Sequence, residues 1–74
     1  MNMKRIVIDG RIRHGKPIIE GTRISVEDVL EMLESGMSYE EIEEEYGLTK
    51  EDILAVIKYV ASLLRGEEVH ELSN

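Results

Sequence analysis

The sequence predicts a mainly α-helical protein: a three-helix, homeodomain-like helix-turn-helix bundle with a short N-terminal β-strand or hairpin. The first indication is a helix start that occurs three times, a Ser or Thr cap followed three residues later by a carboxylate that can accept from the cap's own N–H. The pairs are Ser25 with Asp28, Ser38 with Glu41, and Thr49 with Asp52. The second is a glycine that ends each expected helix, at Gly36, Gly47 and Gly66. The third is the β-branched run Arg5-Ile6-Val7-Ile8, which favours a strand.

The path of the chain after this strand has two interpretations. Asp9-Gly10 favours a two-residue type I′ turn, which makes Arg11-Ile12-Arg13 the return strand of a hairpin. The alternative is a single strand followed by a loop through His14, Gly15 and Lys16. Pro17 cannot donate to a ladder, so any strand through it lies at an edge.

The first helix is expected over residues 26–35, the second from Ser38 to Gly47, and the third from Thr49 to Leu64. Only Gly47 and Leu48 join the second helix to the third, which is typical of a helix-turn-helix. The chain therefore divides into a basic β arm with its loop (1–23), a three-helix domain (24–64) and an acidic, flexible tail (65–74). Inside the second helix we expect Tyr39, Ile42 and Tyr46 to face the interior.

The third helix has more apolar surface than two short helices can cover. One stripe consists of Ile53, Val56, Ile57, Val60 and Leu64, and a second patch of Leu54, Ala61 and Leu63. The excess predicts a homodimer seam or a partner groove. The expected partner-binding residues are Leu54, Lys58, Ala61, Leu63 and Arg65.

Length and composition predict a small soluble protein. A chain of 74 residues is one domain whose core supplies stability on the order of 3–5 kcal/mol, so oligomerisation is the expected extra source. The absence of cysteine excludes disulfides and thiolate metal sites. No run approaches the length of a membrane span and no signal-peptide core is present, so we expect a cytoplasmic protein.

Charge is divided unequally along the chain, although the net value is −7. Residues 1–23 hold six basic and two acidic residues, and residues 24–74 hold three basic and fourteen acidic ones. This asymmetry predicts an electrostatically steered partner, or a dimer in which the arm meets the body. If DNA is bound, the expected contacts are Lys4, Arg5, Arg11, Arg13, Lys16, Arg23 and Lys50. Glu51 and Asp52, at the start of the third helix, would repel phosphate.

The residues that carry chemistry in enzymes have simpler explanations here. His14 and His70 stand far apart and in no metal-ligand spacing, so we expect no metal or other cofactor. Glu43–Glu45 lack a partner acid, base or nucleophile, which indicates a solvated face and no enzyme. Thr22 and Arg23 leave two interpretations. In the first, the Thr hydroxyl caps local backbone and the guanidinium pairs with a carboxylate such as Asp28; in the second, Arg23 binds phosphate or a partner's carboxylate.

Several motifs together resemble the small bacterial and archaeal DUF433 family, over about Ile6 to Leu64. They are Gly15-Lys16-Pro17, then Gly21-Thr22-Arg23-Ile24, then the helix start from Gly36 to Ile42. The resemblance implies a helix-turn-helix antitoxin of the VapB kind, encoded beside a PIN-like ribonuclease toxin, which grips the toxin and represses the shared operon. An arginine of the antitoxin, or the tail 65–74, would block the toxin's acidic active site. The alternative is a stand-alone protein-interaction or DNA-binding module without a toxin partner.

Overall fold

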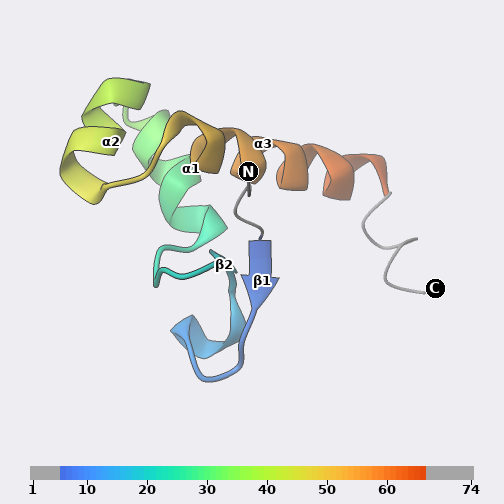
Figure 1. The fold of residues 1–74 in the computed structure, drawn as a ribbon. Coiled ribbons are helices and arrows are strands. Elements are labelled where there is room, and N and C mark those ends of the chain that lie inside the picture. Colours follow the sequence, from blue (N-terminus) through green and yellow to red (C-terminus); the bar gives the residue numbers. More distant parts are fainter. Residues whose placement is uncertain (1–5, 67–74) are drawn as a thin grey trace.

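The computed structural model describes residues 6–66, with a short two-stranded antiparallel sheet followed by three helices (Figure 1). The elements are β1 (Ile6–Ile8), a one-turn segment η1 (Arg13–Gly15), β2 (Pro17–Ile19), α1 (Val26–Glu34), α2 (Tyr39–Tyr46) and α3 (Lys50–Arg65). The mainly helical class, the three helices and the N-terminal β-structure are therefore confirmed. Of the residues predicted above, Lys4, Arg5, His70 and most of the expected tail lie outside the described part.

The three helices begin where the caps predict, because each cap satisfies backbone N–H groups that have no partner within the helix. At α1 the Ser25 hydroxyl accepts from the Asp28 N–H at 2.9 Å, and the Asp28 carboxylate accepts from the Ser25 N–H at 3.0 Å. The same reciprocal pair forms before α2 and before α3. Gly47 ends α2 with φ of 73°, a left-handed conformation that glycine adopts without strain.

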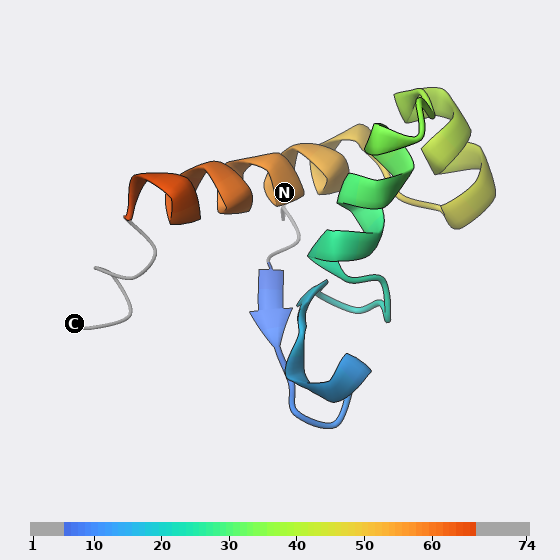
Figure 2. The ribbon, with the colours of Figure 1, turned by 180° about the vertical axis from the view of Figure 1, so that it is seen from behind.

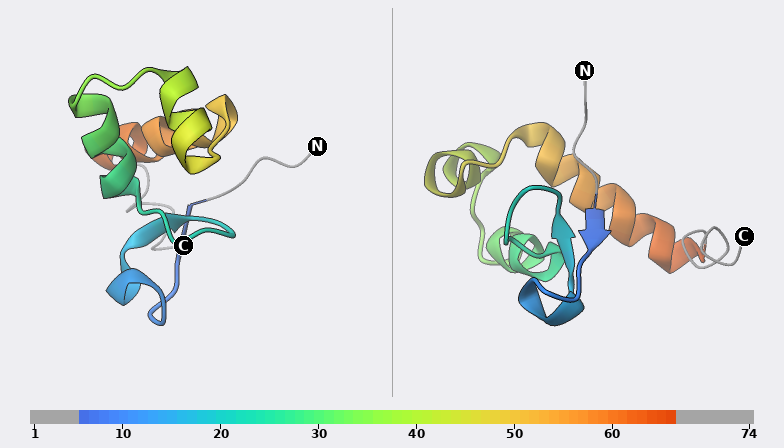
Figure 3. Two further views of the ribbon diagram at one scale, coloured as in Figure 1. Left: turned by 90° about the vertical axis from the view of Figure 1, so that its left-hand side faces the viewer. Right: turned by 60° about the horizontal axis from the view of Figure 1, so that its bottom comes forward.

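The hydrophobic core lies where β2, α1, α2 and the first half of α3 meet. It consists of Ile19, Val26, Val29, Ile42, Leu48, Ile53 and Val56. β1 and β2 lie against one side of this helical unit (Figure 3). The last turns of α3, after Val60, extend beyond the core (Figures 1 and 2).

The return strand predicted over Arg11–Arg13 is wrong: β2 pairs with β1 instead, with Ile6 opposite Ile19 and Ile8 opposite Pro17. The Asp9 carboxylate accepts from the Arg11 N–H at 2.9 Å and the Asp9 carbonyl accepts from the Ile12 N–H at 2.9 Å. The chain therefore turns at Asp9 without entering a strand. It then passes through three consecutive residues of positive φ, Arg13–Gly15, where the second interpretation placed a loop, and enters β2 at Pro17.

The interior position predicted for Tyr46 is also wrong. Tyr46 is 45% exposed, because it is the last residue of α2 and Ile42 is the buried residue of that helix. The first stripe predicted on α3 is divided between core and surface: Ile53 and Val56 are buried, whereas Ile57 is 38% and Leu64 84% exposed. Ile57 faces away from the core, since Val60 beyond it still packs there.

Candidate interaction sites

The loop before α1 is held rigidly by Thr22. Its hydroxyl donates to the Ile19 carbonyl at 2.8 Å and accepts from the Ile24 N–H at 3.0 Å. The backbone closes the same loop, since the Ile19 N–H donates to the Ile24 carbonyl at 3.0 Å. The local capping role predicted for Thr22 is confirmed. The loop fixes Arg23 at the protein surface.

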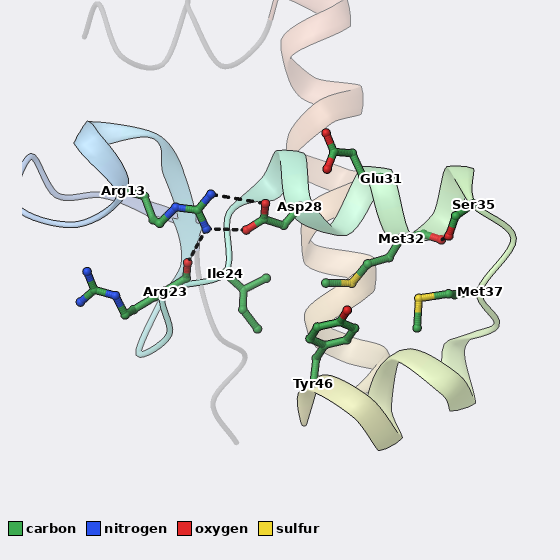
Figure 4. Close-up of a pocket in the computed structure, with 9 residues that line it drawn as sticks. All are labelled: Arg13, Arg23, Ile24, Asp28, Glu31, Met32, Ser35, Met37 and Tyr46. Carbon is green, nitrogen blue, oxygen red and sulfur yellow. Dashed lines mark hydrogen bonds and ion pairs between the residues drawn. The ribbon is translucent and has the colours of Figure 1, made fainter.

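Asp28 pairs with Arg13, whereas the sequence favoured Arg23 as its partner. The Arg13 guanidinium donates to the Asp28 carboxylate at 2.6 Å and to the Arg23 carbonyl at 3.0 Å (Figure 4). Burial alone would raise the pKa of Asp28, but hydrogen bonds from Arg13 and Ser25 outweigh it and lower this pKa below the ordinary value. The Asp28 carboxylate in turn raises the pKa of Arg13. Arg13 thus fastens the turn after β1 to the start of α1.

An open groove of about 470 Å³ lies between the Arg23 loop, α1 and the end of α2 (Figure 4). Its lining residues are Arg13, Arg23, Ile24, Asp28, Glu31, Met32, Ser35, Met37 and Tyr46. The apolar part consists of Ile24, two methionines and the Tyr46 ring, and the Arg13–Asp28 pair lies at one end. The Arg23 guanidinium extends outward at the rim and makes no ion pair or hydrogen bond with other residues of the described segment 6–66. We name this site the Arg23 groove.

Sequence reasoning missed the Arg23 groove, apart from Arg23 itself. The one sequence signal is a pair of methionines, Met32 and Met37, on either side of Gly36. Methionine at a half-exposed position suits an adaptable binding surface. The position of Tyr46 opposite them depends on how α2 folds back against α1, which no local pattern encodes.

Three of the cations predicted to bind DNA are paired with carboxylates of the same chain. Arg11 pairs with Asp9 at 3.0 Å and lowers the pKa of that carboxyl, and Lys16 pairs with Glu27 at 3.0 Å. Arg13 is paired with Asp28, as described above. The Lys50 ammonium lies 6.0 Å from the centre of the Tyr39 ring, at the start of α3.

The start of α3 exposes fewer carboxylates to solvent than the sequence indicates. Asp52 is only 3% exposed, and its carboxylate accepts from the Thr49 N–H at 3.0 Å. It is therefore a capping residue directed inward. Of the two carboxylates expected to repel phosphate here, Glu51 is the one at the surface.

An apolar stripe runs along the exposed side of α3. Leu54, Ile57, Ala61 and Leu64 recur at the spacing that places side chains in one row along a helix. Leu54 is 40% exposed and Leu64 is 84% exposed. Lys58 and Arg65 are exposed beside the stripe. We name these four residues the α3 stripe; Leu63 follows the row of Val56 and Val60 on another side of the helix.

Within residues 6–66, no group of three or more His, Cys, Asp or Glu residues is placed to hold a metal ion. None of the helices in that segment combines the length and the apolar character that crossing a bilayer requires.

Comparison with known proteins gives one family match and a distant relative. The family described as "Protein of unknown function (DUF433)" matches residues 6–60. A protein of Mycobacterium tuberculosis named "Putative antitoxin VapB45" is 28% identical over 57 residues, which are 77% of this chain and 24% of that protein. The chain thus spans about a quarter of this relative's length. No solved structure gives a significant match. Because the family match covers most of the sequence, the chain belongs to the DUF433 family.

Proposed function

We propose that this protein is the antitoxin of a toxin–antitoxin pair, a non-enzymatic protein that binds and inhibits a PIN-like ribonuclease. The family and the name of the M. tuberculosis relative support a toxin partner. The nuclease class comes from the resemblance of the sequence to antitoxins of the VapB kind. The toxin is held on α3.

The observation that carries the proposal is the α3 stripe. Its side chains are anchored on a rigid helix whose first half is packed into the core, so little ordering is needed on binding. Complete burial of a leucine side chain contributes about 1.5–3 kcal/mol. Leu64 is 84% exposed in the free chain and offers most of that gain to a partner. Leu54, Lys58, Ala61 and Arg65 remain proposed contact residues, whereas Leu63 lies on another side of the helix and is not part of this surface.

Co-expression with the protein encoded by the adjacent gene tests the proposal. The two proteins should co-elute on size exclusion, and the complex should not cleave RNA. The double variant Leu54→Lys/Leu64→Lys should lose both properties while its helix content stays unchanged. Ile8→Lys is the matched control, because Ile8 on β1 is 64% exposed and lies off the α3 stripe. Absence of co-elution and of inhibition for the unmodified chain would reject the proposal.

Operator binding is a second candidate, favoured by the inward position of Asp52. Lys50 lies at the first turn of α3, after the tight connection from α2, where a recognition helix meets DNA. Two copies would be needed, since one chain offers few free cations to phosphate. An electrophoretic shift on the gene's own upstream DNA should weaken steeply between 50 and 200 mM salt, by a factor that depends on the phosphates contacted. No shift, or a shift that is insensitive to salt and to Lys50→Glu, would remove this candidate.

A further inference from the structure

We propose that the Arg23 groove binds the segment Glu67–Leu72 of a second copy of this chain. The inference does not depend on a toxin, because groove and ligand are both supplied by the protein itself. It rests on the chemistry of the groove, on the composition of the segment and on the distance the chain can span.

The groove offers an apolar depression next to a cation that has no partner within residues 6–66. Met32, Met37 and the Tyr46 ring form an adaptable surface, since an unbranched thioether side chain adjusts to the shape of its ligand. Asp28 is already paired with Arg13 at 2.6 Å, which leaves Arg23 as the cation available to a ligand. Glu31 also lines the groove, but it lies on α1 away from Arg23, so a ligand carboxylate would bind at the Arg23 end (Figure 4). The fitting ligand is an aliphatic side chain that is flanked by carboxylates.

The segment that follows α3 has this composition. It reads Glu67-Glu68-Val69-His70-Glu71-Leu72, with two aliphatic residues three positions apart and a carboxylate next to each. An arginine can bind a carboxylate through two parallel hydrogen bonds, which adds orientation to the attraction. The aliphatic side chains would enter the apolar depression while a glutamate binds Arg23.

The short reach of the segment after α3 indicates that the ligand comes from a second copy. The groove includes Tyr46, at the end of α2 that leads into α3, whereas the segment starts after Gly66 at the far end of α3 (Figure 1). The 16 residues of α3 span about 24 Å at 1.5 Å per residue. Leu72 lies six residues beyond Gly66 and reaches at most about 20–22 Å even when the backbone is fully extended. Even if it folded straight back along α3, the segment would therefore fall short of the Tyr46 end of its own groove, and two copies can exchange segments.

The absence of cysteine makes a direct test possible with the full chain. A spin label is attached to the cysteine of the Ser73→Cys variant. This variant is mixed with an equal amount of the unmodified chain, which contains no cysteine and carries ¹⁵N. The proposal expects selective broadening of the ¹⁵N amide signals of Ile24, Met32, Met37 and Tyr46. Absence of broadening in this mixture at high protein concentration, or broadening that falls on the α3 stripe, would overturn it. So would broadening of the groove signals that occurs only when one chain carries both the label and ¹⁵N.

Variants with reversed charges test whether Arg23 and the acidic segment pair specifically. Arg23→Glu should lose the broadening, and so should Glu67→Lys/Glu68→Lys/Glu71→Lys, because each variant places like charges together. A mixture of these two variants should regain it, since the basic segment of one matches the acidic rim of the other. Arg11→Glu, at an exposed arginine outside the groove, should behave like the unmodified chain. Failure of the mixture to regain the signal would contradict the pairing of Arg23 with this segment.

Discussion

Replacement of Asp28 by alanine should destabilise the protein more than any other change at an exposed carboxylate. Asp28 accepts from the Ser25 N–H at 3.0 Å and so completes the cap of α1. It also accepts from the Arg13 guanidinium at 2.6 Å, which ties the turn after β1 to α1. One substitution therefore removes a helix cap and a contact between segments that are 15 residues apart in the sequence.

The magnitude follows from these two losses. Removal of a capping interaction costs about 1 kcal/mol. The ion pair is partly solvated, with 29% of the Asp28 side chain exposed, so its loss adds roughly 0.5–1 kcal/mol. Together these reach about 1.5–2 kcal/mol, which should lower Tm by about 6–16 °C in a domain of this size. The loss is a large fraction of the stability on the order of 3–5 kcal/mol that such a core provides.

Thermal unfolding followed by circular dichroism measures the effect, with Glu27→Ala as the matched control. Glu27 is the adjacent carboxylate in the first turn of α1, and its pair with Lys16 is largely exposed. Its removal should cost no more than about 0.5 kcal/mol. If both variants melt at the same temperature, the capping and Arg13 contacts do not stabilise the protein as argued.

The pH dependence has a definite sign. Because the pKa of Asp28 is lowered in the folded state, its contribution is complete above the ordinary value of 3.8 and is lost as pH falls through the folded-state pKa. The difference in Tm between the unmodified chain and Asp28→Ala should therefore be constant near neutral pH and shrink below pH 3.8. A difference that grows on acidification would refute the assigned direction.

Three further changes test the backbone and the core. Gly47→Ala should lower stability by about 1–2 kcal/mol for conformational reasons, since φ is 73° and an added Cβ meets no atom within 4 Å; an unchanged urea midpoint would contradict this. His14→Gly should raise stability by up to about 1 kcal/mol, because it relieves a positive φ of 58°, and a lower Tm would show that the imidazole contributes more than the strain. Ile42→Ala should cost about 2–5 kcal/mol and leave much of the chain unfolded at 37 °C, as far-ultraviolet circular dichroism would report.

The helices could be predicted because their starts and ends depend on residues close together in the sequence. A hydroxyl and a carboxylate three positions apart, as in Ser38 and Glu41, close their hydrogen bonds within one turn. The glycine after each helix acts through its own φ. No knowledge of the tertiary fold enters either interaction, which is why the start and end of each helix agree with the prediction to within a residue or two.

The β-structure and the groove depend on contacts between distant segments. Asp9-Gly10 is a strong hairpin signal, but the Asp9 side chain forms a different turn, and β2 reaches β1 only after the left-handed residues Arg13–Gly15. The same path of the chain brings Arg13 to Asp28 and leaves Arg23 at the surface. Charge pattern alone allows either arginine to pair with Asp28, and the path of the loop decides between them.

The distribution of ion pairs favours a protein partner over nucleic acid as the main ligand. Arg11, Arg13 and Lys16 were expected to supply phosphate contacts, but each is held by a carboxylate of the same chain. Neutralised cations release fewer counterions on DNA, so the affinity and the salt dependence both fall. The exposed glutamates of α2 would meet the phosphate backbone unfavourably if α3 entered a groove. The α3 stripe carries no such penalty, and its burial gains free energy from a protein surface but not from a phosphate chain.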